Sequence, residues 1–97
     1  MRIEELVWLE NIVEKLASKH GVSTIEVEAI FASAPHIRYV CKGRRNRDEN
    51  VYAAYGQTEA GRYLVVFFIF KPRGNLALII SARDMDGKER KRYGKEN

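Results

Sequence analysis

The sequence is poor in the residues that build disulfide-bonded, metal-bound or membrane-spanning proteins. Its 97 residues include one cysteine, two histidines and two prolines. One cysteine cannot form an internal disulfide and fits a reducing compartment, so we expect a cytoplasmic protein. So few histidines and cysteines, far apart in sequence, predict no metal site and no cofactor. The longest apolar run, Tyr63 to Phe70, is far shorter than the roughly 20 residues of a membrane span.

Charge is divided unevenly along the chain. Residues 1–35 carry three basic and six acidic side chains, a net charge of −3. Residues 36–97 carry 14 basic and seven acidic ones, a net charge of +7, and the two parts sum to the overall +4. Such asymmetry favours a polyanionic partner such as nucleic acid. The alternative is an ordinary solubilising surface charge. Glu4 and Glu5 stand where a signal peptide would carry basic residues, so none is expected.

The length predicts one domain, residues 1–97, with a single core. Helical periodicity covers residues 10–20, and Gly21 can end that helix in a left-handed conformation. Residues Leu6–Leu9 fit either an extension of this helix or a short buried strand. Ser23 and Glu26 form a capping-box pattern that begins a second helix, which Pro35 should end. The residues of this helix expected to face inward are Val27, Ile30, Phe31 and Ala34.

The second part of the chain reads as strands and turns followed by a short helix. Asp86 and Glu89 match another capping box, so a basic helix should close the chain. Helices segregated from a run of antiparallel strands predict an α+β fold in two layers. The expected architecture is two N-terminal helices, a four-stranded antiparallel sheet and a short C-terminal helix, with a short strand before the first helix left open. The strands are expected at residues 37–41, 51–57, 62–70 and 76–82.

Several short motifs together resemble those of the BrnT toxins. The run Lys19–Ser23 is similar to their KHGVS-type motif, and Trp8 precedes it at their usual spacing. The run Ile80–Arg83 is similar to the end of their closing strand. Glu89-Arg90 followed by Tyr93 fits their terminal helix. The resemblance spans nearly the whole chain, from Trp8 to Tyr93.

This resemblance implies a compact fold similar to that of RelE toxins and a ribonuclease activity that arrests growth. It also implies a partner, a small DNA-binding antitoxin of the BrnA type with a ribbon-helix-helix fold, and a complex that represses its own operon. RNA is the implied substrate. We expect no membrane partner, and a homodimer within the toxin–antitoxin complex is left open. Because the chain has no clustered metal ligands, metal-independent cleavage is the leading hypothesis.

RNA cleavage can use the 2′-hydroxyl of the substrate as its nucleophile, so the enzyme must move protons and stabilise phosphate charge. Arg83 is the leading candidate for phosphate stabilisation, against an ordinary surface ion pair. His20 is the candidate for proton transfer, against a helix-capping role. Lys19 and Arg90 are candidates for phosphate binding at the catalytic site. Glu89 could be a base, although the capping box explains it better.

A basic turn and one aromatic side chain are candidates for RNA binding. Basic loops beside aromatic residues are typical of proteins that bind single-stranded nucleic acid. Solvated turn residues, or a tyrosine that pins the last helix to the sheet, are the alternatives. The candidate RNA-binding residues are Arg44, Arg45, Arg47 and Tyr93.

Three positions depart from the BrnT pattern, because Leu9, Ile12 and Leu16 replace polar residues that are common there. The alternative function is therefore a catalytically silent BrnT-like module that binds RNA or an antitoxin. A regulatory DNA-binding protein is less favoured, because only the turn at Gly21 hints at a helix-turn-helix. The enzyme hypothesis requires Arg83 and His20 to converge on one ribose–phosphate linkage.

Overall fold

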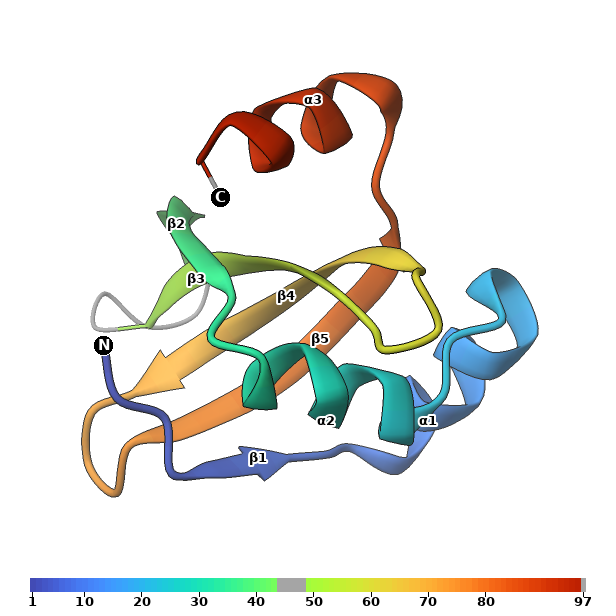
Figure 1. Cartoon of the computed structure of the whole chain (residues 1–97). Coiled ribbons are helices and arrows are strands. Elements are labelled where there is room, and N and C mark those ends of the chain that lie inside the picture. The colour runs from blue at the N-terminus through green and yellow to red at the C-terminus, as the bar shows by residue number, and fades with distance from the viewer. Residues whose placement is uncertain (44–48, 97) are drawn as a thin grey trace.

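The computed structural model describes residues 1–43 and 49–96. They form a five-stranded sheet with strand order β1-β5-β4-β3-β2 and helices on both faces (Figure 1). β1 pairs parallel to β5, whereas the other neighbouring strands are antiparallel. The elements in chain order are β1 (Glu5–Val7), α1 (Glu10–Lys15) with its π-helical continuation η1 (Leu16–His20), α2 (Thr24–Ala32), β2 (His36–Lys42), β3 (Asn50–Gln57), β4 (Tyr63–Lys71), β5 (Leu76–Asp84) and α3 (Gly87–Glu96).

The α+β class is as predicted, but the prediction of four antiparallel strands is wrong. A fifth strand, β1, lies along β5 with Leu6 opposite Ala77. Residues 6 and 7 are therefore strand, and the first helix begins only at Glu10. β5 also extends two residues beyond the predicted end at Ala82, so Arg83 lies within the strand. Its side-chain direction is therefore set by the strand alternation.

The predicted helix ends agree with the structure at two places. Gly21 has φ 60°, in the left-handed region, and ends η1. The Ser23 hydroxyl accepts from the Glu26 N–H at 3.2 Å, and the Glu26 carboxylate accepts from the Ser23 N–H at 3.0 Å. The expectation that Ala34 faces the core is wrong, because Ala34 is exposed with φ 55°. Pro35 excludes the helical conformation from the preceding residue.

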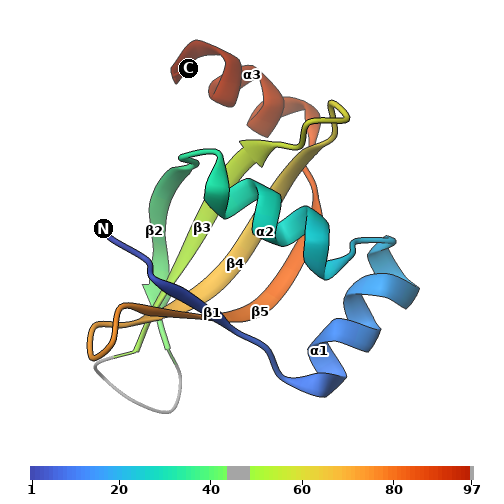
Figure 2. The same cartoon turned by 60° about the horizontal axis from the view of Figure 1, so that its bottom comes forward.

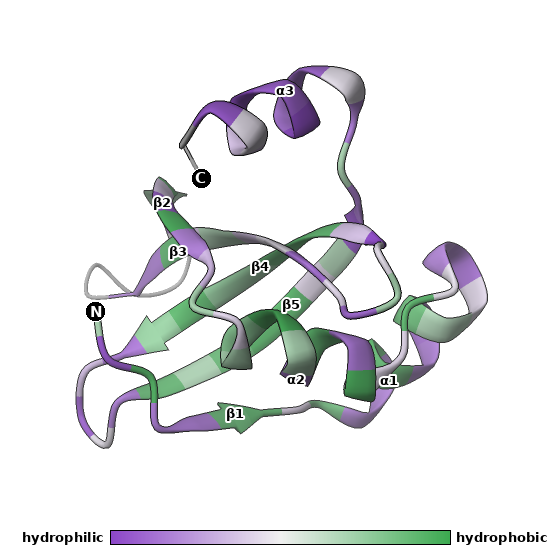
Figure 3. Cartoon of the chain, in the orientation of Figure 1, coloured by the Kyte–Doolittle hydropathy of each residue, from purple (hydrophilic) through white to green (hydrophobic). Residues whose placement is uncertain are grey.

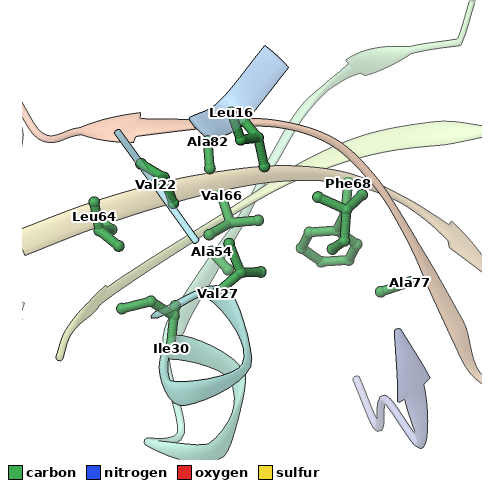
Figure 4. Close-up of a cluster of buried hydrophobic side chains, with 11 residues drawn as sticks. Leu16, Val22, Val27, Ile30, Ala54, Leu64, Val66, Phe68, Ala77 and Ala82 are labelled. Atoms are coloured by element: carbon green, nitrogen blue, oxygen red, sulfur yellow. The ribbon is translucent and has the colours of Figure 1, made fainter. Parts of the chain in front are cut away.

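The main core lies between the sheet and the helices of the N-terminal part of the chain, a side of the sheet that we call the α1–α2 side (Figure 4). α2 packs directly on β3 at Gly56, where an added Cβ would lie 3.1 Å from the Ile30 Cγ2 atom. The absence of a side chain at Gly56 therefore lets the helix approach. The buried residues of this cluster are Leu16, Val22, Val27, Ile30, Ala54, Leu64, Val66, Phe68, Ala77, Ile79 and Ala82.

The opposite face of the sheet has a much smaller apolar cluster of Ala53, Val65 and Met85, with partly buried aromatic side chains around it. α3 lies on this side, away from α2 (Figures 1 and 2). Figure 3 shows that α3 is largely hydrophilic. Because α3 is polar and packs on this face, some of its charged side chains lie close to the strands. We call this side of the sheet, together with α3, the α3 face.

Candidate functional site

Strand register assembles a row of chemically active side chains across the α3 face. Val65 on β4 lies opposite both Tyr55 on β3 and Arg83 on β5, and Tyr55 lies opposite His36 on β2. Residues paired across strands project from the same face. Arg38 lies on the same side, two residues after His36. An imidazole, a phenol and two guanidinium groups thus come from three strands to one face.

Arg83 makes a two-pronged ion pair with Glu89 of α3. Its Nη1 and Nη2 atoms lie 2.7 and 3.0 Å from the Glu89 Oε1 and Oε2 atoms. Nη1 also donates to the Asp84 carbonyl at 3.1 Å, and the guanidinium carbon lies 5.5 Å from the centre of the Phe67 ring. The side chain is 38% exposed. The fork is therefore held in place on two sides and remains accessible to solvent.

Glu89 forms the capping box that the sequence favoured over a role as base, and it also binds Arg83, a contact that the sequence did not predict. It completes the predicted capping box, since its Oε1 accepts from the Asp86 N–H and its own N–H donates to the Asp86 Oδ1, both at 2.8 Å. The same carboxylate binds Arg83, and this hydrogen bond is the main reason that the pKa of Glu89 is lowered. The ion pair in turn raises the pKa of Arg83. Both side chains are charged at neutral pH.

A small pocket between α3 and the sheet adjoins this ion pair. Burial, followed by the negative charge of Glu89, raises the pKa of the Tyr55 phenol. The phenol therefore stays protonated at neutral pH and can donate a hydrogen bond. Basic, acidic and phenolic groups meet in one pocket, where they could bind an anion and transfer protons. The pocket is lined by Arg38, Tyr55, Glu89, Arg92 and Tyr93. Arg83 borders it through its ion pair with Glu89, and we call the pocket and this ion pair together the Arg83 pocket.

Tyr93 and Arg90 attach α3 to the sheet through their planar groups. The Tyr93 ring meets the rings of His36 and Tyr63 edge to face, at centroid distances of 5.6 and 6.0 Å. The Arg90 guanidinium carbon lies 4.4 Å from the centre of the Tyr63 ring. The structure thus agrees with the packing role considered for Tyr93. An RNA-binding role for Tyr93 stays a prediction.

The expectation that His20 converges with Arg83 is wrong. The backbone carbonyls of His20 and Gly21 accept hydrogen bonds from the Arg62 guanidinium, which also binds Asp84 and Glu26 of α2. Asp84 follows Arg83 in β5, so the two side chains project to opposite faces. The Lys19–His20 corner therefore lies on the α2 side of the sheet. The strand alternation separates two residues that the motif spacing suggested were partners.

Arg62 was not singled out from the sequence, yet it joins three separate parts of the chain. The hydrogen bonds from Arg62 are the main reason that the pKa of Asp84 is lowered. The pKa of Glu26 is also lowered, mainly by the Ser23 backbone N–H and further by Arg62. A lone arginine before an apolar strand carries no distinctive sequence signal. Its importance arises only when η1, α2 and β5 meet.

Replacing Arg62 with methionine should lower the free energy of unfolding by about 1–2 kcal/mol at pH 7, because Glu26 loses a partly buried charged donor, while the 61% exposed Asp84 side chain is screened by solvent and adds little. Folded-state pKa values below the ordinary 3.8 of Asp84 and 4.5 of Glu26 stabilise the fold above those values. This contribution is lost as the pH falls through the folded-state values. Urea unfolding at several pH values should therefore show the deficit shrinking below about pH 4.

Arg73→Met is the matched control, since it removes one exposed arginine from the β4–β5 turn. It should change the unfolding free energy by less than about 0.5 kcal/mol. An Arg62→Met deficit that is equal at pH 3 and pH 7 would contradict the assigned linkage to Glu26 and Asp84.

The three sequence-based candidates in the basic turn cannot be placed, and three residues near the pocket were not predicted. Arg44, Arg45 and Arg47 lie outside the described residues. His36, Arg38 and Arg92, which line or border the pocket, were not predicted as site residues. For His36 and Arg38, the sequence shows only that they lie two residues apart on a predicted strand, which does not say which face of the sheet they occupy.

The three residues that depart from the BrnT pattern lie away from the α3 face. Leu16 is 3% exposed in the main core, and Ile12 packs against that core. Leu9 is exposed just before α1. These positions belong to the α1–α2 side of the sheet. The apolar residues there therefore do not line the Arg83 pocket.

In residues 1–43 and 49–96, no three or more His, Cys, Asp or Glu side chains gather as potential metal ligands. No helix in this part of the chain is both long and apolar enough to cross a membrane.

Comparison with known proteins identifies the family. The family model described as the ribonuclease toxin BrnT of type II toxin–antitoxin systems matches residues 8–89. The chain belongs to the BrnT family. This match includes most of the motifs that suggested the resemblance, from Trp8 through Glu89, whereas Arg90 and Tyr93 lie beyond it. BrnT proteins are ribonuclease toxins of type II toxin–antitoxin systems, so the Arg83 pocket is considered below as an RNA site.

The structural comparison agrees with the family assignment. The 1.1 Å crystal structure of the Brucella abortus ribonuclease toxin BrnT matches with a TM-score of 0.57 and 17% sequence identity. The match covers 84% of this chain and 96% of that chain. At this identity the similarity establishes a BrnT-like fold. No curated protein matches the sequence.

Proposed function

We propose that this BrnT protein is a metal-independent endoribonuclease that cleaves RNA on the α3 face and thereby arrests growth, acting in the cytoplasm. The observation that carries the proposal is the accessible Arg83–Glu89 fork beside Tyr55 and Arg38. An arginine fork suited to a carboxylate is equally suited to two phosphate oxygens.

RNA binding in this proposal begins with an exchange of anions. The scissile phosphate takes the place of the Glu89 carboxylate on Arg83, with Arg38 and Arg92 adding positive charge nearby. Arg83 keeps its position because the Asp84 carbonyl and the Phe67 ring still contact it. Glu89 keeps its hydrogen bond from the Asp86 N–H. The exchange therefore leaves both partners oriented.

The cleavage step uses groups that already line the pocket. The 2′-oxygen of RNA attacks the adjacent phosphorus while Glu89, displaced from Arg83, accepts the 2′-hydroxyl proton. The bond from phosphorus to the 5′-oxygen breaks, and the Tyr55 hydroxyl donates a proton to that oxygen. The products are a 2′,3′-cyclic phosphate and a 5′-hydroxyl. Arg83 stabilises the charge that develops on the non-bridging oxygens, and each proton transfer contributes about 10²–10⁴-fold.

Other basic residues in this proposal bind RNA without taking part in bond cleavage. Arg44, Arg45 and Arg47 are assigned to phosphate contacts that steepen salt dependence without selecting sequence. Tyr93 is assigned to base stacking at the pocket edge. His20 and Lys19 are left out of the catalytic site, because they lie on the α2 side of the sheet.

The proposed partner is an antitoxin of the BrnA type with a ribbon-helix-helix fold, in keeping with a family that belongs to type II toxin–antitoxin systems. The sequence resemblance supplies this identity. We also propose that the toxin forms a homodimer within that complex. The mass of the co-purified toxin–antitoxin complex, measured by light scattering, tests this.

Purified protein incubated with RNA in excess EDTA tests the proposed reaction. We expect cleavage with 2′,3′-cyclic phosphate and 5′-hydroxyl ends, and no cleavage of 2′-O-methyl RNA, which lacks the nucleophile. Induced expression in a bacterial host should stop growth. Cleavage that requires added divalent metal, or that leaves 5′-phosphate ends, would contradict the mechanism. Tight RNA binding without any cleavage would establish the alternative, a catalytically silent module.

A further inference from the structure

A second hollow lies against α3 and is separate from the Arg83 pocket. Tyr93 lines both, so the two hollows are adjacent. The second hollow combines β3, β4 and α3 side chains. The residues that line it and matter here are Gln57, Tyr63, Arg90, Lys91, Tyr93 and Gly94.

The hollow has flat surfaces suited to a nucleobase. The Arg90 guanidinium lies 4.4 Å from the centre of the Tyr63 ring, and Tyr63 meets Tyr93 edge to face. Bases of single-stranded RNA stack on such aromatic rings and guanidinium planes. The Gln57 Nε2 atom donates to the Gly61 carbonyl at 3.3 Å, which leaves its second N–H and its carbonyl oxygen for a base edge. The surface therefore combines stacking with polar recognition.

The charge of this hollow differs from that of the Arg83 pocket. Arg90 and Lys91 are both cationic, and no carboxylate is among the described residues that line it. A phosphodiester can therefore approach Lys91 without displacing an internal anion, unlike at Arg83, where Glu89 occupies the fork.

We infer that this hollow is a second nucleotide subsite, which binds the base of a nucleotide flanking the scissile phosphate while Lys91 contacts its backbone. The inference rests on the proposed function, because it places the scissile phosphate at Arg83. It assigns the choice of flanking base to Gln57 and the stacking surface to Arg90 and Tyr63. α3 then lies between the reaction pocket and a recognition pocket.

Gly94 allows the hollow to be filled. A Cβ atom added at Gly94 meets no heavy atom within 4 Å, so Gly94→Phe can introduce a ring at the rim without a clash at Cβ. We expect Gly94→Phe to lower kcat/KM about tenfold for single-stranded RNA, consistent with loss of one stacked base. Ala32→Phe adds the same ring at an exposed position at the end of α2, on the other side of the sheet, and should cleave like the parent protein. Equal thermal midpoints would exclude unfolding as the cause.

Abasic substitution locates the subsite. RNA with one abasic nucleotide at each flanking position in turn should identify one position that lowers parent cleavage about tenfold. Gly94→Phe should be insensitive at that position. Equal cleavage by the parent protein of every abasic RNA would overturn the subsite while leaving the proposed function intact. Failure of the parent protein to cleave any RNA would instead count against the proposed function, and the subsite would fall with it.

Discussion

Arg83→Lys should lower the rate of RNA cleavage by about 10²–10³-fold, the cost of removing one positioned donor from a transition state. Lysine keeps the positive charge but cannot offer two parallel N–H groups to two phosphate oxygens. RNA affinity should fall much less than the rate, because the charge is retained. Single-turnover cleavage and fluorescence anisotropy with 2′-O-methyl RNA measure the two effects separately.

Arg73→Lys is the matched control for this experiment. Arg73 precedes β5 and Arg83 lies near the end of that strand, so the same substitution is made at opposite ends of one element. The control should cleave at the parent rate. A parent-like rate for Arg83→Lys, with a normal thermal midpoint, would remove Arg83 from the reaction.

Glu89→Gln should change binding and catalysis in opposite directions. Glutamine has nearly the same shape and can still cap α3, but it does not hold Arg83 with a negative charge. Non-cleavable RNA should therefore bind more tightly, on the order of tenfold. Cleavage should fall by about 10²–10⁴-fold, because the proton acceptor is lost. Anisotropy and single-turnover kinetics again supply the two measurements.

Asp86→Asn is the control that separates these effects from helix capping. It changes net charge by the same amount and alters the other half of the capping box, while Arg83 keeps its carboxylate partner. It should leave the cleavage rate near that of the parent. If Glu89→Gln weakens binding and cleavage together, in step with a lower thermal midpoint, Glu89 serves only to hold α3.

Local features of the fold were predictable because they depend on neighbouring residues. The capping boxes at Ser23 and Asp86 place side-chain acceptors beside the first free N–H groups of α2 and α3, which needs no tertiary contact. The same holds for Gly21, whose positive φ ends η1. Pairing of β1 with β5 brings together residues about 70 positions apart in the chain. No local pattern specifies that partner.

The candidate site was predictable in part. The motif match led to Arg83 and Glu89, and the structure joins them. The same match also suggested His20, which lies on the other side of the sheet. Side-chain direction in a strand reverses with every residue, so the face is decided by the register of β5 and by which face α2 covers. Both are tertiary properties.

Binding of RNA to the α3 face can be mapped by NMR. Backbone amide and arginine Nε–H signals would be followed as 2′-O-methyl RNA is added. We expect the largest shifts at Arg38, Tyr55 and Arg83 and along α3, with little change in α1, η1 or α2. Shifts concentrated at Lys19 and His20, with Arg83 unaffected, would contradict binding at the α3 face.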